Sequence, residues 1–152
     1  MCYKNKVCSS AQQYCSLMIA VADDLNTTEL VLGTLATVTL RNKNATAAVQ
    51  DAKCISAVFD TMRLHTDSGS IQRQCCMVIR NCAVSCTSFK SSLLNSGAAQ
   101  LVRAAKYAHP SHCIDVGSAA LRDLDCSDYN DGWNPCTLVL GANGDIIDTQ
   151  NI

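Results

Sequence analysis

Three histidines and eleven cysteines are the residues of this 152-residue chain best suited to nucleophilic catalysis or metal binding. Zinc sites usually show Cys-x2-Cys or His-x3-His pairs that are repeated at a distance. The chain offers two looser clusters, which are Cys75, Cys76, Cys82 and Cys86, and His109, His112 and Cys113. Neither cluster has the second pair. The sequence therefore predicts no metal site and no cofactor.

Most of the cysteines are better explained as small core side chains. Their number is odd, their spacing is irregular, and the first residues lack the plan of a secretory signal. Free cysteine is also among the most buried residue types. We therefore expect reduced, buried thiols, with Cys2, Cys8 and Cys136 near the ends as the reactive ones. A cysteine-rich thiol or metal-binding helical protein is the alternative.

No other spacing indicates catalysis. His112 and Cys113 are adjacent, so on a helix their side chains point to different faces, which is a poor arrangement for a base and a nucleophile. The GANG loop at 141–144 lacks the Lys-Ser/Thr of a phosphate loop and reads as a hairpin turn between 137–140 and 145–147. We therefore expect no enzymatic activity.

Composition narrows the class of protein. The chain has 12 Lys+Arg against 13 Asp+Glu, and this balance argues against nucleic acid as a partner. No apolar run approaches the roughly 20 residues of a membrane span. The hydrophobic content of 48% favours a folded chain over a disordered one. A cytoplasmic protein is expected, with the nucleus as a second location.

A short pattern recurs along the chain. The runs TVTLRN, CMVIRN and SAALRD end at Asn42, Asn81 and Asp123, which are 39 and 42 residues apart. A second correspondence has an offset of 43 and places apolar residues on one helical face: Ile55, Val58, Phe59 and Met62 match Ala98, Leu101, Val102 and Ala105. A period of about 40 residues is typical of helical repeats.

The segments between these runs have helical patterns. We expect helices at 26–40, 45–50 and 53–64, then at 70–85, 88–94 and 98–108, and a last one at 111–124. Asn26, Ser70 and Ser111 are the expected N-caps. The order in each unit is taken as medium, short and long.

The stretch IQRQCCMVIRNCAVSCTSFKSSLLNSGAAQLVRAAKYAH, residues 71–109, resembles an armadillo repeat. The resemblance extends over about 26–133 and is most specific at 72–81. It implies an all-α fold, a right-handed superhelix of about three units that holds partner proteins. The units are a partial one at 1–25, then 26–66, 68–110 and a last helix at 111–125, followed by a tail at 134–152.

Two features depart from that family. Armadillo proteins that bind extended peptides commonly carry Asn on the third helix of each unit, and neither 53–64 nor 98–108 contains one. Binding of nuclear-import signals is therefore not expected. Gly97 has no counterpart near Asp51 and Ala52, so the turn of that earlier unit is expected to be bent differently.

The offset alignment suggests a binding face. If the apolar set is core, then Asp60 and Arg63 point away from it, and so do their counterparts Arg103 and Lys106, with Tyr107 beside them. Tyrosine and arginine on an exposed face are common binding anchors. These five residues form the predicted groove face of a non-enzymatic protein-binding scaffold.

The first residues suggest an open end. Residues 11–24 read as a third helix with no first helix before it, so the chain is expected to be the C-terminal fragment of a longer repeat protein. The apolar side of this helix carries Tyr14, Leu17, Met18 and Val21. We expect self-association through this face, and Leu17→Glu should weaken it.

Overall fold

A computed structural model describes residues 12–132, 138–140 and 146–148 of the chain. Residues 12–132 contain eight helices, so the all-α expectation is confirmed for this part. They are residues 12–20, α2 (Leu25–Thr39), α3 (Lys43–Asp51), α4 (Cys54–Leu64), α5 (Gly69–Ser85), α6 (Thr87–Asn95), α7 (Ala98–Ala108) and α8 (Pro110–Asp123).

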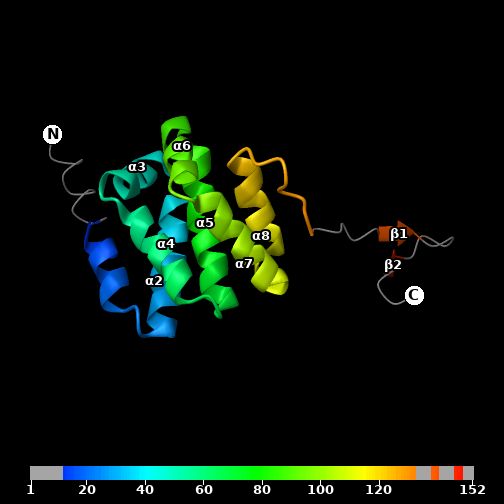
Figure 1. Cartoon of the computed structure of the whole chain (residues 1–152), viewed down its shortest axis with the longest axis horizontal. Coiled ribbons are helices and arrows are strands. Elements are labelled where there is room, and N and C mark those ends of the chain that lie inside the picture. The colour runs from blue at the N-terminus through cyan, green and yellow to red at the C-terminus, as the bar shows by residue number, and fades with distance from the viewer. Residues whose placement is uncertain (1–11, 133–137, 141–145, 149–152) are drawn as a thin grey trace.

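The long helices form a layer with α5 at its centre. Helix α5 packs most extensively against α8 and α2, and it also contacts α4 and α7, which touch each other. Figure 1 shows the helices as a row from residues 12–20, in blue, to α8, in yellow, with α3 and α6 along one edge. Residues about 40 positions apart in the sequence are therefore neighbours in space.

The order of helix lengths differs from the expected one. Helices α2, α3 and α4 have 15, 9 and 11 residues, and α5, α6 and α7 have 17, 9 and 11. The first helix of each triplet is therefore the longest, and the expected order of medium, short and long is wrong. The same succession of lengths nevertheless occurs twice, and α8, with 14 residues, follows as another long helix.

Three helices begin at side-chain caps. Asp24 accepts hydrogen bonds from the backbone N–H groups of Asn26 and Thr27, at 3.1 and 3.3 Å, and opens α2. Asn42 caps α3 and Ser68 caps α5 in the same way. These bonds satisfy N–H groups that have no partner inside the helix.

The predicted caps were therefore wrong. Asn26 and Ser70 lie within the first turns of α2 and α5, two residues after the true caps. Ser111 lies inside α8, which begins with Pro110 and has no side-chain cap. Proline suits that first position because the N–H group it lacks would be unpaired there.

The turns before α4 and α7 share a left-handed backbone. Lys53 has φ 54° and ψ 28°, and Gly97 has φ 89° and ψ 18°. The turn before α4 therefore has the same left-handed conformation although it lacks a glycine. The expectation that the two turns differ is wrong. Lys53 adopts a conformation that normally favours glycine, at a cost of about 1–2 kcal/mol.

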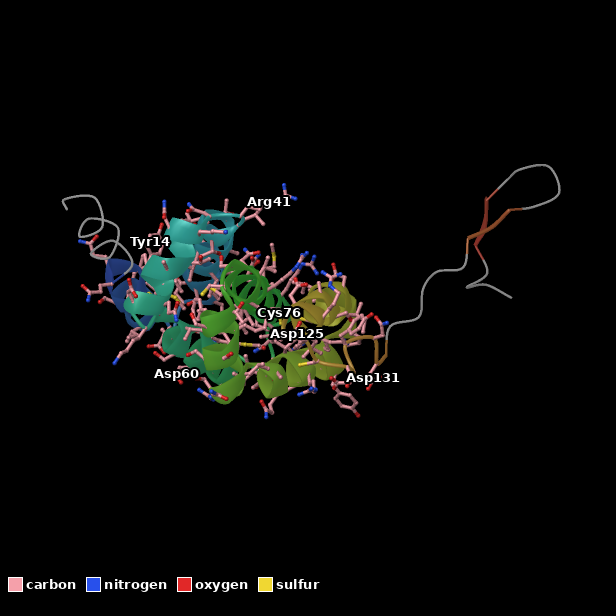
Figure 2. The ribbon with its side chains drawn as sticks, turned by 90° about the horizontal axis from the view of Figure 1, so that it is seen from above. Tyr14, Arg41, Asp60, Cys76, Asp125 and Asp131 are labelled. Atoms are coloured by element: carbon pink, nitrogen blue, oxygen red, sulfur yellow. A yellow bond between two sulfur atoms is a disulfide. The ribbon has the colours of Figure 1, made fainter. Side chains whose placement is uncertain are left out.

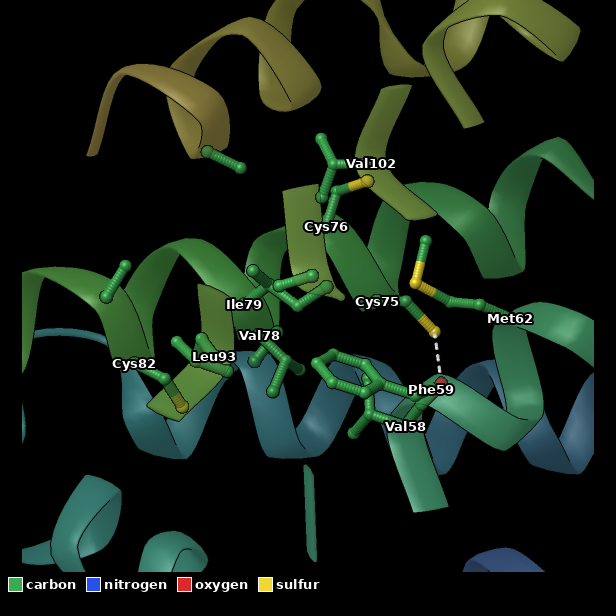
Figure 3. Close-up of a cluster of buried hydrophobic side chains, with 14 of the residues drawn as sticks. Val58, Phe59, Met62, Cys75, Cys76, Val78, Ile79, Cys82, Leu93 and Val102 are labelled. Atoms are coloured by element: carbon green, nitrogen blue, oxygen red, sulfur yellow. Dashed lines mark hydrogen bonds between the residues drawn. The ribbon is translucent and has the colours of Figure 1, made fainter. Parts of the chain in front are cut away.

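The core combines aliphatic side chains with buried thiols (Figure 3). The two helical faces predicted from the offset of 43 contribute six buried residues: Val58, Phe59, Met62, Ala98, Val102 and Ala105. Ile55 and Leu101 are half-buried and pack against this core. Cys75, Cys76 and Cys82 of α5 are fully buried, and the Cys75 thiol donates to the backbone carbonyl of Val58 at 3.8 Å.

One cysteine pair contradicts the expectation of free thiols throughout the chain. Cys15, on helix 12–20, is bonded to Cys54 at the start of α4, 39 residues later. The spacing in the sequence does not indicate this pair, because the two residues meet only when helix 12–20 packs beside α4. Cys75, Cys76, Cys82, Cys86, Cys113 and Cys126 are free as expected, whereas Cys2, Cys8 and Cys136 lie outside the described residues.

Near the C-terminus the two strands expected for a hairpin pair with each other. Strand β1 (Leu138–Leu140) pairs antiparallel with β2 (Ile146–Asp148), and Val139 lies opposite Ile147. The GANG turn between the strands lies outside the described residues.

Within the described chain, no helix combines the length and the apolar character that a bilayer crossing requires.

Candidate binding site

The predicted groove face is divided between two places. Asp60 and Arg63 lie on α4 and pair with each other at 2.8 Å, with 74% and 55% of their side-chain surfaces exposed. Figure 2 shows Asp60 well apart from Asp131, which lines a pocket beside α7. Asp60 and Arg63 therefore form an ordinary solvated ion pair on one helix, and they do not line the pocket beside α7.

The other three predicted residues do meet at one pocket. Arg103, Lys106 and Tyr107 of α7 line a cavity of about 410 Å³ together with α8 and the segment after it. Its other lining residues are Pro110, Ile114, Leu121, Asp128, Asp131 and Gly132. Tyr107 is 92% exposed at the pocket, so an aromatic ring is available to a ligand.

The sequence suggested that Lys106 lies on an exposed face, and the structure shows that it does not. It is only 6% exposed, and its Nζ donates to the backbone carbonyls of Tyr129 and Asp131 at 2.8 and 3.1 Å. Burial lowers the pKa of Lys106, while the nearby Asp131 and Asp128 carboxylates oppose that shift. The lysine thus fastens the segment after α8 onto α7.

The stem of Lys106 crosses α8 at Gly117. A Cβ built on Gly117 would lie 2.9 Å from Lys106 Cδ and closer still to Cγ. The absence of a side chain at this helical position is therefore what lets the lysine pass. This contact was hard to predict from the sequence, because a glycine inside a helix has several explanations.

Arg103 also binds the segment that follows α8. Its Nε and Nη2 donate to the two carboxylate oxygens of Asp128 at 2.5 and 2.8 Å. The hydrogen bonds raise the pKa of Arg103 and lower the pKa of Asp128. Since Arg103 and Lys106 are both engaged, Tyr107 is the predicted anchor that remains free for a partner.

A larger hollow lies on a face that the sequence reasoning missed. Side chains of α2 and α5 line a groove of about 720 Å³, here named the α2–α5 groove. Its residues are Asn26, Glu29, Leu30, Gly33, Thr34, Thr37, Val38, Gln74 and Met77. Leu30 is 71% exposed and Val38 is 46% exposed, so the groove offers apolar surface flanked by polar groups.

The periodicity of α2 contained a signal for this groove. Its exposed positions Asn26, Leu30, Thr37 and Val38 and the half-buried Thr34 follow a spacing of three and four residues, which puts them on one helical face. Apolar residues on a face opposite the core are unusual enough to suggest a contact surface. The groove face predicted from the sequence lay on α4 and α7 instead.

Polar contacts join successive long helices about one period apart. Ser70 of α5 donates to Glu29 of α2 at 2.8 Å, over 41 residues. Asn81 Nδ2 of α5 donates to the carbonyl of Ala36 at 2.8 Å, 45 residues away. Between α5 and α8, the contacts Arg73–Asp115 and Arg80–Asp123 span 42 and 43 residues.

Two of the three histidines have structural contacts of their side chains. His109 Nε2 lies 2.6 Å from the carbonyl of Thr66, and His112 Nδ1 lies 3.0 Å from Ser111 Oγ. In the described part of the chain, no group of three His, Cys, Asp or Glu side chains is arranged to hold a metal ion.

Two thiols differ from the inert core cysteines. The Cys76 thiol hydrogen bonds to Cys113, which raises the pKa of Cys76 and lowers that of Cys113. Cys86 is exposed beside the N-terminus of α6, and hydrogen bonds from Ser88 and from the backbone N–H groups of Phe89 and Ser88 lower its pKa. Its position directly before the helical pattern was the sequence signal for this thiol.

These features define an all-α protein whose long helices carry an open groove. No protein-family model matches the chain, and neither a curated protein nor a solved structure matches it. The comparisons therefore assign the chain to no family, and its function must be argued from its own surfaces.

Proposed function

We propose that the chain is an armadillo-type helical solenoid that acts as a non-enzymatic scaffold for a protein partner, and that the partner binds in the α2–α5 groove. The observation that carries this proposal is the groove itself, because it combines about 720 Å³ of open space with the exposed apolar side chains Leu30 and Val38. Soluble proteins seldom leave such surface uncovered without a binding role.

The solenoid part of the proposal is supported by repetition. The succession of a long, a short and an 11-residue helix occurs twice, and Lys53 and Gly97 share the same left-handed turn. The polar contacts between long helices also recur at about one period. A stack of similar units produces this pattern, because each unit contacts chiefly its neighbours.

The family resemblance adds to this support once the helix lengths are corrected. The long helices are α2, α5 and α8, and two of them contain Asn, at Asn26 and Asn81. Asn26 lines the groove, whereas Asn81 is bonded to the end of α2. The absence of Asn from α4 and α7 therefore does not count against peptide binding by the long helices. The run 72–81 also suggests a likeness to the C-terminal end of armadillo repeat-containing protein 6, to which the comparisons add nothing.

A peptide-display selection tests the proposed function. Random peptides are selected on the full chain, and those enriched are measured against Leu30→Glu, which places a charge in the α2–α5 groove. We expect Leu30→Glu to weaken the selected peptides by at least tenfold, about 1.4 kcal/mol. The control is Leu64→Glu, which alters an exposed leucine of α4 outside the groove. Peptides that bind both variants as well as the wild type would refute the groove as the site.

Self-association through helix 12–20 is a separate proposal about partners. Met18 is 2% exposed and belongs to the core, whereas Leu17 and Ile19 are 44% and 71% exposed. The apolar surface available to a second copy is therefore formed by Leu17 and Ile19. Sedimentation over micromolar to near-millimolar concentration should reveal association that Leu17→Glu weakens, and a strictly monomeric wild type would refute it.

A further inference from the structure

The α2–α5 groove is apolar along its middle. Leu30 and Val38 of α2 and the half-buried Met77 of α5 line it with apolar side chains. Gly33 lies between Leu30 and Val38, and a Cβ built on it would have no neighbouring atom closer than 3.7 Å. The open space over Gly33 can therefore receive an apolar side chain of a partner.

The polar side chains of the groove leave few hydrogen-bonding groups free. The hydroxyl groups of Thr34 and Thr37 each donate to a backbone carbonyl in the preceding turn of α2, at 2.8 and 2.9 Å. The side-chain amides of Asn26 and Gln74 are the lining groups that make no hydrogen bond within the described chain. The groove therefore offers little to the backbone of a bound peptide.

This shortage of free polar groups favours a helical partner over an extended one. An extended segment presents N–H and C=O groups along its whole length, and those that become buried need hydrogen-bond partners. A helix pairs these groups internally and presents a ridge of side chains instead. Leu30 and Val38 are eight residues apart in α2. That separation is about 12 Å along the helix axis, slightly more than two turns of a partner helix.

Glu29 gives the groove a negative charge, and the other described residues of the lining are neutral. Its Oε2 accepts a hydrogen bond from the neutral hydroxyl of Ser70 at 2.8 Å, and within the described chain the carboxylate makes no ion pair. The two arginines of α5, Arg73 and Arg80, are held by carboxylates of α8. The charge of Glu29 is therefore uncompensated and favours a cation on the partner.

We propose that the partner segment in the α2–α5 groove is an amphipathic helix whose apolar face is flanked by a lysine or arginine that pairs with Glu29. The inference rests on the proposed function, because it names the kind of partner that the groove binds. Apolar side chains of the partner cover Leu30 and Val38, and one of them enters the space over Gly33. Helix 12–20 of a second copy does not meet this description, because residues 12–20 contain no lysine or arginine.

Two matched peptide libraries test the shape of the partner. One randomises a face of an alanine-based helical host, and the other carries the same randomised residues in a host with regularly spaced prolines, which prevent a helix. Both are selected on the full chain, and binders are compared on the wild type and on Leu30→Glu. We expect peptides that depend on Leu30 from the helical library.

The outcomes separate this inference from the proposed function. If the proline library yields peptides that depend on Leu30 and bind as tightly as those from the helical library, the helical partner is refuted and the proposed function stands. If neither library yields a peptide that depends on Leu30, the proposed function itself fails, and this inference fails with it.

Glu29→Gln tests the role of the charge. Glutamine keeps an oxygen that accepts the hydrogen bond from Ser70, so the substitution removes chiefly the charge. At low ionic strength, the selected helical peptides should bind Glu29→Gln about threefold to fivefold more weakly than the wild type. The control is Asp60→Asn, which removes an exposed carboxylate of α4 outside the groove and should leave the affinity unchanged. Equal affinity for Glu29→Gln and the wild type would overturn the pairing.

An exchange of charges identifies the residue that Glu29 meets. Glu29→Lys places a cation opposite the basic residue of the peptide, so it should weaken binding by about tenfold. Replacing that basic residue of the peptide with glutamate should restore the affinity for Glu29→Lys and weaken binding to the wild type. Circular dichroism shows that Glu29→Lys is folded, and Glu29→Gln gives the answer if it is not. Failure of every exchanged peptide to regain affinity for folded Glu29→Lys would overturn the proposal.

Discussion

Arg73 of α5 holds Asp115 of α8 with two hydrogen bonds, from Nη1 to Oδ1 at 2.6 Å and from Nη2 to Oδ2 at 3.0 Å. The same Nη1 also donates to the backbone carbonyl of His112 at 2.5 Å. One side chain therefore binds both the main chain and a carboxylate of the neighbouring long helix. This contact fixes how far α8 can slide along α5.

The Arg73–Asp115 pair should make stability depend on acidity. The hydrogen bond from Arg73 lowers the pKa of Asp115 below its usual 3.8. Because the folded-state pKa is depressed, the stabilisation is complete above the unfolded pKa and is lost as the pH falls through the folded value. We expect Asp115→Asn to lower the free energy of unfolding at pH 7 by about 0.5–1 kcal/mol, as for a partly exposed pair.

Urea unfolding at pH 7, 4 and 3 measures this effect, and the difference between Asp115→Asn and the wild type should shrink as the pH falls below about 4. Asp60→Asn is the control, because the Asp60–Arg63 pair lies within one exposed helix. Its effect at pH 7 should stay near or below about 0.5 kcal/mol. A difference for Asp115→Asn that is independent of pH would contradict the assignment.

Two glycines in long helices should respond oppositely to alanine. A Cβ at Gly117 collides with the stem of Lys106, whose amine is held by two carbonyls and cannot easily move away. We expect Gly117→Ala to lower the free energy of unfolding by about 1–3 kcal/mol. At Gly33 of α2 the nearest atom to a Cβ is 3.7 Å away, so Gly33→Ala should raise it by about 0.5–1 kcal/mol. Chemical unfolding measures the free energy of unfolding of both variants. Changes of the same sign in the two variants would contradict this account.

The left-handed turns before α4 and α7 allow a second matched pair of variants. Lys53→Gly replaces a strained residue with one that adopts φ 54° freely, although glycine gains entropy in the unfolded chain. The net effect should be a gain of up to about 1 kcal/mol in the free energy of unfolding. Gly97→Ala, at φ 89°, should cost about 1–2 kcal/mol. Equal losses in both variants would show that the turns differ.

Cys86 should be the most reactive thiol of the described chain. It is exposed and its pKa is lowered, chiefly by the hydrogen bond with Ser88, whereas burial raises the pKa of Cys82 to about 12. At pH 7.5, iodoacetamide should therefore label Cys86 well before Cys82. Ser88→Ala should slow the labelling of Cys86. Both thiols lie in the tryptic peptide 81–90, so fragmentation of that peptide in the mass spectrometer assigns the label to each thiol and measures both rates. Simultaneous labelling of the two sites would contradict the prediction.

The sequence was sufficient for the elements whose signals are local. Helical periodicity placed α7 at its observed bounds and the other helices within a few residues, because an apolar stripe must face the core. The caps were missed by two residues, since Asp24 and Asn26 are both good caps and only the backbone angles distinguish them.

Features that depend on distant segments were not predicted. Lys106 looked exposed from its own helix, and it is buried because the segment with Tyr129 and Asp131 folds back over it. To predict the Cys15–Cys54 bond, one would have to know that helix 12–20 packs beside α4. The α2–α5 groove exists because two long helices 41 or more residues apart lie next to each other.

The Cys15–Cys54 bond also gives the chain a closed loop, in which α2 and α3 lie inside a covalent ring. Arg41 lies exposed in a left-handed turn between these two helices, where trypsin can reach the backbone. A single cut there opens the ring but leaves both pieces joined through sulfur. The nicked protein should therefore migrate as one band on a denaturing gel without reductant, and as two bands once the disulfide is reduced.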